Sequence, residues 1–183
     1  MKCKQIVFTE KNKAELLTVD VNEPAPNEVM VETMVSTISC GTERANLTGD
    51  PNVNALGGAG VVFPRTSGYN SAGIVVKKGA DVKSVDVGDR VVVYWGQHKS
   101  YNIVPEENVV KIDDDNISLE TAAMSFISTF PMAAIRKTRI EMGESAIVMG
   151  LGILGMIAVK LLRAAGAVPI IAADPNPARR EIA

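Results

Sequence analysis

One glycine-rich stretch, residues 145–174, constrains the fold of this chain more than any other segment. Its glycines follow the spacing G-x-G-x-x-G. An apolar run, Ala146–Met149, precedes the glycines, and apolar residues at helical spacing follow them. A second apolar run, Val168–Ala173, closes the stretch and leads into Asp174. This order predicts a strand–turn–helix–strand unit whose two strands are parallel and buried.

The three glycines each suit a different part of a phosphate-binding turn. Gly150 permits the tight turn, Gly152 lets the backbone approach a pyrophosphate, and Gly155 lets helix and strand pack closely. The helix start, at Ile153 and Leu154, offers free backbone amides and the positive end of the helix dipole. The pattern therefore predicts a dinucleotide site.

The acid at the end of the second apolar run bears on which dinucleotide is bound. Asp174 lies where an acid can accept hydrogen bonds from both ribose hydroxyls. Its charge would repel a 2′-phosphate, so we expect NAD rather than NADP. The alternative is a glycine-rich turn in an α/β domain that binds no ligand.

Composition excludes several other classes of function. The chain has 183 residues, 22% of them charged, and a net charge of −2, so no basic surface for nucleic acid is expected. Aromatic residues, at 4%, are too few for a base-stacking surface. Two cysteines favour a reducing, cytoplasmic location, and the start of the chain has no signal-peptide pattern. We expect a small-molecule substrate and neither a nucleic acid nor a membrane partner.

Residues 1–116 have many short strand patterns separated by turns, which predicts a small β-barrel. Residues 40–63 contain five glycines and little periodicity, so we expect a long connection there. The strand candidates are Gln5–Thr9, Ala14–Val21, Glu28–Thr37, Ser71–Lys77, Arg90–Tyr94, Ser100–Val104 and Asn108–Ile112.

The pattern becomes helical after the barrel segment. Leu119–Arg139 is expected to form a helix that Ser118 caps and Pro131 breaks or kinks. These patterns divide the chain into a barrel at 1–116, a helical linker at 117–142 and a dinucleotide unit at 143–183. The fold class is thus a β-barrel plus α/β, with the first β-α-β of a Rossmann fold.

Several short motifs, in this order, resemble the medium-chain dehydrogenase/reductase superfamily of zinc-type alcohol dehydrogenases. The resemblance implies a GroES-like barrel followed by a Rossmann domain, and it implies hydride transfer with a nicotinamide cofactor. The matching segments are Glu23–Val31 (E-P-A-P-N-E-V-M-V), Ser39–Glu43 (S-C-G-T-E), Ser67–Gly73 (S-G-Y-N-S-A-G), Val87–Val91 (V-G-D-R-V) and Gly150–Gly155.

The chain departs from the superfamily where its zinc-dependent members hold metal. The resemblance places Tyr69 and Asn70 where those members have histidine and glutamate ligands, and Ser125 where they have a ligand in the linker. Cys40 alone cannot hold zinc, which needs three protein ligands, and the four-cysteine structural lobe is missing. We therefore expect no metal. The T-E-R after Cys40 resembles the subgroup that includes bacteriochlorophyllide dehydrogenase.

The resemblance also assigns candidate catalytic residues. Thr42 matches a hydroxyl that relays a proton, and Tyr69 offers a hydrogen bond to a substrate carbonyl. His98 is either a general acid near the substrate or an exposed, inert histidine on a turn. Cys40 is either a buried apolar thiol or a nucleophile. Thr129 matches a residue near the nicotinamide, unless its hydroxyl only satisfies the helix break.

Two further side chains have expected places. Glu43 matches an acid that supports the metal-binding histidine, or it binds Arg44 or a backbone amide. Trp95 is expected to line the substrate cleft or cover the barrel edge.

The sequence thus predicts an NAD(H)-dependent, zinc-independent alcohol or polyol dehydrogenase. Superfamily members are about twice as long, so we expect a fragment that does not turn over by itself. An exposed half-sheet edge after Asp174 would favour association, so we expect a homo-oligomer. One alternative is an NADPH-dependent quinone or enone reductase. A second is a truncated, non-catalytic dinucleotide-binding module.

Overall fold

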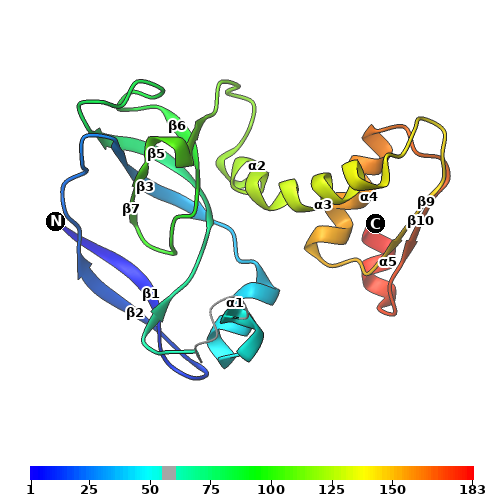
Figure 1. Ribbon diagram of the computed structural model, residues 1–183, viewed down its shortest axis with the longest axis horizontal. Coiled ribbons are helices and arrows are strands. Elements are labelled where there is room, and N and C mark those ends of the chain that lie inside the picture. The colour runs from blue at the N-terminus through cyan, green and yellow to red at the C-terminus, as the bar shows by residue number, and fades with distance from the viewer. Residues whose placement is uncertain (55–60) are drawn as a thin grey trace. The chain divides into compact units, whose positions relative to one another are not determined.

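The computed structural model describes residues 1–54 and 61–183 and divides the chain into two compact units, Met1–Ser125 and Phe126–Ala183 (Figure 1). The boundary falls inside the segment that the sequence predicts as a helical linker. In the described ranges no helix has the length and apolarity that crossing a bilayer requires.

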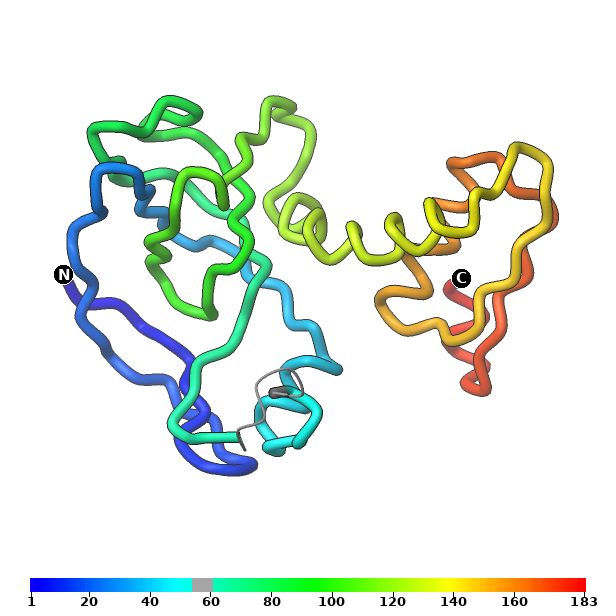
Figure 2. The backbone as a smooth tube through the Cα atoms, in the orientation of Figure 1, coloured from blue at the N-terminus to red at the C-terminus, as the bar shows by residue number. Residues whose placement is uncertain are grey.

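The first unit is built from two antiparallel sheets, which agrees with the predicted barrel (Figure 2). The larger sheet has the order β7-β3-β5-β6-β8 and the smaller one the order β2-β1-β4. A single bridge between Gln5 and Lys99 extends the smaller sheet towards the larger one. The strands are β1 (Lys2–Glu10), β2 (Lys13–Asp20), β3 (Glu28–Ser36), β4 (Arg65–Thr66), β5 (Asn70–Lys78), β6 (Arg90–Tyr94), β7 (Tyr101–Pro105) and β8 (Val109–Lys111).

Valines form the main core of this unit. Their β-branched side chains suit strands, and alternate positions point to the same face of the sheet. Val29 and Val31 of β3, Val75 of β5, and Val91 and Val93 of β6 are at most 1% exposed and belong to one cluster. A second, smaller core lies where α2 (Leu119–Ala123) covers the other face, around Ala72, Val92, Ala122 and Ala123. The strand register that orders this sheet therefore comes from its buried valines.

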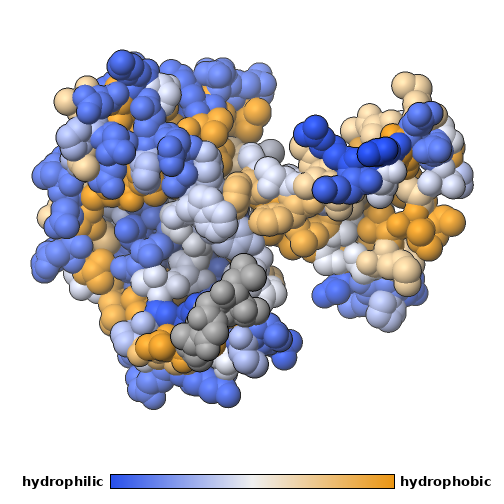
Figure 3. Space-filling model, viewed as in Figure 1, coloured by the Kyte–Doolittle hydropathy of each residue, from blue (hydrophilic) through white to orange (hydrophobic). Residues whose placement is uncertain are grey.

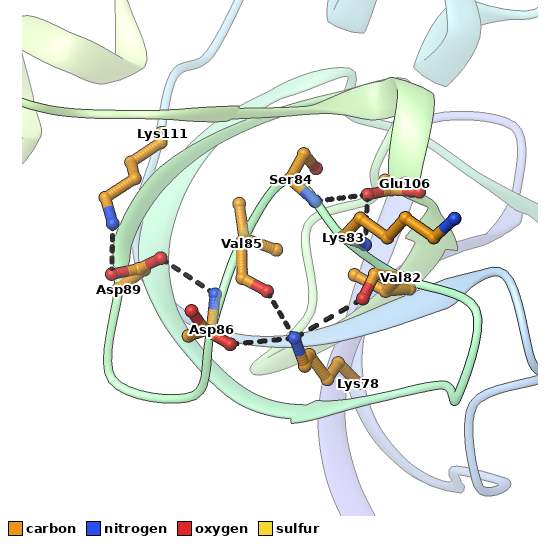
Figure 4. Close-up of polar contacts among 9 residues, drawn as sticks. All are labelled: Lys78, Val82, Lys83, Ser84, Val85, Asp86, Asp89, Glu106 and Lys111. Atoms are coloured by element: carbon orange, nitrogen blue, oxygen red, sulfur yellow. Dashed lines mark hydrogen bonds and ion pairs between the residues drawn. The ribbon is translucent and has the colours of Figure 1, made fainter.

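The turn-rich segment after β5 is held by charged side chains as well as by the buried Val82 and Val85 of the main core (Figure 4). The Lys78 ammonium donates to the carbonyls of Val82 and Val85 and to the Asp86 carboxylate, at 3.3, 3.0 and 2.7 Å. Glu106, in the short 3-10 helix η2 (Glu106–Asn108), accepts hydrogen bonds from two consecutive backbone amides of the same loop. These contacts satisfy backbone groups that no strand pairs.

The expected long connection at 40–63 is wrong in its first part, because Cys40–Thr48 forms helix α1. The helix ends at Gly49, whose φ of 65° is the left-handed conformation that glycine adopts most easily. Its buried side chains, Glu43 and Asn46, are polar, so hydrophobic periodicity gave no sign of the helix. The 3-10 turn η1 (Pro51–Asn54) follows, and residues 55–60 lie outside the described residues.

The helical segment after the barrel breaks earlier than expected. It consists of α2, which Ser118 caps by accepting the Thr121 amide, and α3 (Ser125–Thr138). Pro131 lies inside α3 and is buried. The predicted break at Pro131 is therefore wrong, and the alternative of a kink there stays a prediction. Burial of the ring is the physical reason we see, since apolar packing offsets the one amide hydrogen bond that proline removes.

The second unit contains the predicted β-α-β order. The parallel strands β9 (Ala146–Met149) and β10 (Ile170–Ala173) pair in register, α4 (Ile153–Ala164) connects them, and α5 (Pro177–Ile182) follows. The expectation that both strands are buried is wrong for one face of the two-stranded sheet that β9 and β10 form. Ile147, Met149 and Ile171 are 62, 81 and 54% exposed, whereas the alternate residues of both strands are partly buried. Figure 3 shows apolar surface on this unit.

Candidate functional site

A backbone turn between β9 and α4 is built from the three motif glycines. Gly150 has a φ of 90°, which side-chain-bearing residues rarely adopt. A Cβ on Gly155 would come within 1.8 Å of the Gly150 carbonyl oxygen, so the start of α4 packs directly on the turn. A Cβ on Gly152, in contrast, would meet no atom within 4 Å. Open space thus lies beside the backbone that the sequence assigns to a pyrophosphate.

The start of α4 supplies backbone donors next to that space. Gly152 is the N-cap residue, and no side chain caps the helix. Ile153 is half-buried and Leu154 is 44% exposed. The first amides of a helix have no intrahelical partner, so they are free to bind an anion. Thr129 is an exposed residue of α3, and its hydroxyl donates to the Phe126 carbonyl at 2.7 Å.

Asp174 joins the end of β10 to the glycine turn. One carboxylate oxygen accepts the Leu151 amide and the other accepts the Asn176 amide, both at 2.8 Å. The Arg179 guanidinium lies 3.6 Å from the carboxylate. The amides of Leu151 and Asn176, with a smaller contribution from Arg179, hold the pKa of Asp174 below its ordinary value. Sequence reasoning missed the Leu151 contact, because it joins residues from two strand ends.

In the barrel unit, α1 exposes Cys40 and Thr42 in its first turn. The expectation of a buried Cys40 thiol is wrong, because the residue begins a surface helix and its sulfur lies 3.9 Å from the Ile38 carbonyl. The Thr42 hydroxyl oxygen lies 3.3 Å from that of Ser39. The structure therefore leaves both side chains accessible.

Glu43, in the same turn, faces His98 instead of solvent. Glu43 Oε1 lies 3.4 Å from His98 Nε2, and the other carboxylate oxygen accepts a hydrogen bond from Ser67. His98 Nδ1 lies 2.9 Å from the Ser36 hydroxyl oxygen. Because His98 is only 6% exposed, the alternative of an exposed histidine on a turn is wrong. Nothing in the sequence signals Ser36 and Ser67 as its neighbours.

The electrostatics of Glu43 reflect these neighbours. Burial alone raises the pKa of a carboxyl group. The His98 imidazole, the Ser67 hydroxyl and the Gly68 amide outweigh burial and hold the pKa of Glu43 below its ordinary value. Glu43 therefore stays ionised inside the unit at neutral pH.

Tyr69 and Trp95 lie against each other close to this cluster. Their ring centroids are 6.2 Å apart, with the planes tilted by 38°. Trp95 is 64% exposed and has a φ of 61°, and its amide donates to the Tyr69 carbonyl. Backbone strain of this kind clusters at functional sites, which makes Trp95 a candidate for one.

The donor set does not fit a metal ion. Over residues 1–54 and 61–183, no three His, Cys, Asp or Glu side chains come together in a way that would hold one. Asn70, where the resemblance expects a carboxylate, is 2% exposed and carries an amide, which is a weak zinc ligand compared with Cys, His or carboxylate.

Comparisons with known proteins find dehydrogenases. Residues 25–114 match the alcohol dehydrogenase GroES-like domain. The chain is 26% identical to L-threonine 3-dehydrogenase from Pyrococcus abyssi, and the match covers 93% of this chain and 55% of that enzyme. It is 31% identical to (R,R)-butanediol dehydrogenase from Bacillus subtilis, over 64% of this chain and 41% of that enzyme.

Solved structures show the same fold. A structure described as a zinc-binding dehydrogenase from Sinorhizobium meliloti 1021 bound to NADP has a TM-score of 0.85 at 21% identity, and the match covers 100% of this chain and 59% of that one. An alcohol dehydrogenase from Escherichia coli CFT073 complexed with NADH also has a TM-score of 0.85 at 21% identity, covering 98% of this chain and 59% of that one.

The match at residues 25–114 and the dehydrogenase relatives support the predicted resemblance to the medium-chain dehydrogenase/reductase superfamily. The chain spans about half the length of the curated relatives that it matches.

Proposed function

We propose that the chain is part of an NAD(H)-dependent oxidoreductase that interconverts an alcohol and a carbonyl compound without a metal ion. The observation that carries this proposal is the glycine turn with Asp174 beside it. The turn has open space at Gly152 and close packing at Gly155, as a pyrophosphate-binding turn requires. Relatives that are dehydrogenases support the class of reaction.

The second unit would hold the adenosine and pyrophosphate half of the cofactor. The amides of Ile153 and Leu154 would bind the phosphates, and Asp174 would accept hydrogen bonds from the ribose hydroxyls. A carboxylate accepts about four hydrogen bonds, and the Leu151 and Asn176 amides use two. The negative charge at this position is our reason for proposing NAD over NADP.

The bound nicotinamide supplies the hydride chemistry, so the barrel unit has to orient the substrate and move a proton. Thr42 is exposed and carries a hydroxyl at the start of α1, which suits a proton relay. Tyr69 offers a phenol to a substrate carbonyl, with Trp95 packed against its ring. Cys40 would supply an accessible thiol near Thr42, and the exposed Thr129 would contact the nicotinamide.

Metal independence rests on the missing ligands at positions 69 and 70. The cytoplasmic location is supported by two free cysteines. Association into a homo-oligomer is supported by the exposed apolar face of β9 and β10. The finer resemblance to bacteriochlorophyllide dehydrogenase rests on the T-E-R motif after Cys40.

Calorimetric titration of the purified chain with NADH and with NADPH tests the proposal. We expect NADH to bind at least tenfold more tightly, and metal analysis to find less than a tenth of a zinc equivalent. Equal or tighter binding of NADPH would favour the quinone or enone reductase alternative. Binding of neither nucleotide, or one zinc per chain, would contradict the proposal.

A further inference from the structure

A buried polar cluster connects α1 to three other segments of the barrel unit. Glu43 of α1, Ser36 at the end of β3, Ser67 before β5 and His98 before β7 form it. We propose that the Glu43–His98 pair is a positioning pair that fixes the first turn of α1 against the segment carrying Tyr69. For its catalytic consequence this inference rests on the proposed function.

The contacts link the segments in a chain. The Glu43 carboxylate contacts two side chains: one oxygen accepts a hydrogen bond from the Ser67 hydroxyl, and the other lies 3.4 Å from the His98 imidazole. The other ring nitrogen of His98, Nδ1, lies within hydrogen-bond distance of the Ser36 hydroxyl. Each of these residues comes from a different segment, so the cluster joins α1 by side-chain contacts to the ends of the strands around it.

Burial makes these contacts obligatory. The side chains of His98 and Glu43 are 5% and 11% exposed. Glu43 Oε1 and His98 Nε2 are buried, and neither has a hydrogen bond that meets the usual geometric criteria. The two atoms lie 3.4 Å apart, so each is stabilised electrostatically by the other. Removing one partner leaves a buried polar group uncompensated, which is far costlier than losing a surface ion pair.

The backbone also brings the Tyr69 segment close to His98. The His98 amide donates to the Ser67 carbonyl at 2.9 Å. Gly68 has a φ of 103°, and a Cβ on it would come within 2.6 Å of the His98 backbone nitrogen. Only glycine allows this approach, so the segment before Tyr69 lies directly on His98.

The candidate catalytic side chains are sequence neighbours of the cluster. Thr42 immediately precedes Glu43, and Tyr69 immediately follows Gly68. Any shift of Glu43 relative to His98 therefore moves the Thr42 hydroxyl relative to the Tyr69 phenol. Small displacements of this kind reduce reaction rates strongly, because catalysis depends on fixed geometry.

Hydrogen exchange of the whole chain tests the pair without any cofactor. Glu43→Gln keeps the side-chain shape and removes its charge. We expect exchange of the α1 amides to become at least tenfold faster, while exchange in Phe126–Ala183 stays unchanged. The matched control is Glu23→Gln, whose exposed carboxylate pairs with Lys77 at 2.7 Å, and it should leave α1 exchange unchanged. Ser36→Ala is a milder variant in case Glu43→Gln does not fold.

The fluorescence of Trp95, the one tryptophan of the sequence, separates positioning from mere stability without turnover, because its ring packs against Tyr69 and its amide donates to the Tyr69 carbonyl. For folded Glu43→Gln we expect a shifted emission maximum, which a loss of stability alone would not cause, and for Glu23→Gln we expect the emission of the unmodified chain. Unchanged α1 exchange in Glu43→Gln and Ser36→Ala, or equal acceleration throughout the barrel unit, would overturn the inference. Absence of nucleotide binding in the unmodified chain would instead overturn the proposed function and leave the exchange result standing.

Discussion

Two glycine-to-alanine substitutions, three residues apart, should have opposite consequences. Gly155→Ala places a methyl group 1.8 Å from the Gly150 carbonyl oxygen, which belongs to the backbone and cannot rotate away. Gly152→Ala places a methyl group in open space. We expect Gly155→Ala to destabilise the second unit and Gly152→Ala to weaken nucleotide binding with the fold intact.

The magnitudes follow from the geometry. Overpacking a core lowers the free energy of unfolding by about 1–3 kcal/mol and occasionally more. Because the clash in Gly155→Ala is with backbone at such a short distance, we expect a loss at or above the upper end of that range. A unit the size of Phe126–Ala183 has a stability of roughly 3–9 kcal/mol at 0.05–0.15 kcal/mol per residue. Gly152 has φ and ψ of −74° and −170°, which alanine adopts readily. Its substitution should change stability by less than about 1 kcal/mol, since lower unfolded-state entropy offsets a poorer N-cap.

Thermal unfolding and calorimetry with NADH check both variants. Gly155→Ala should lower the melting temperature of the second unit by about 10 °C or more. Gly152→Ala should keep its melting temperature and weaken NADH binding by about tenfold or more, which is at least ~1.4 kcal/mol. Normal NADH affinity in a well-folded Gly152→Ala protein would refute the assignment of the turn to the pyrophosphate.

Two further predictions concern the barrel unit and use denaturant unfolding. Lys78→Met should lower the free energy of unfolding by about 1–2 kcal/mol, because two loop carbonyls lose an ammonium donor that is 30% exposed. The control Lys77→Met breaks an exposed ion pair and should lower the free energy of unfolding by less than about 1 kcal/mol. Equal effects of the two substitutions would contradict the role of Lys78. The folded-state pKa of Glu43 is lowered, so its contribution to stability is complete above the ordinary value near 4.5 and is lost as pH falls through the folded pKa. The stability gap between the unmodified chain and Glu43→Gln should therefore shrink below about pH 4.5, and a gap that stays constant from pH 7 to 3 would contradict this.

Sequence patterns were informative where one physical rule dominates. The residues of β9 and β6 coincide with their predicted ranges, because apolar runs bounded by glycine and turn residues have few alternatives. The two-sheet barrel unit agrees with the alternation and turns of residues 1–116.

The sequence was uninformative where polar burial or long-range contact decides. Helix α1 buries Glu43 and Asn46, so its amphipathic pattern is invisible to a hydrophobicity rule. Pro131 stays within α3, because tertiary packing overrides its local preference. The pairing of Glu43 with His98 joins residues 55 positions apart (98 − 43), a distance at which a single sequence has no pattern. Candidate roles for Thr42, Tyr69, Cys40 and Thr129 stay predictions.

The acid after β10 has two tasks, and this determines how its substitution should be tested. Asp174 holds the glycine turn through the Leu151 amide and lies 3.6 Å from Arg179. Asp174→Ala therefore loosens the turn for every nucleotide and, in addition, leaves the Arg179 cation unpaired where a 2′-phosphate would lie. Absolute affinities mix both effects, but the ratio of NADH to NADPH affinity cancels the first.

We expect this ratio to fall by about 10–100-fold in Asp174→Ala, the equivalent of one charge-assisted hydrogen bond of ~1.5–3 kcal/mol. Replacing Arg179 by alanine as well should restore part of the ratio, because the second variant has no cation for the phosphate. Calorimetry of both variants with the two nucleotides measures the change. A ratio that stays constant across all three proteins would mean that neither charge selects the cofactor, and the preference for NAD would have to come from other residues.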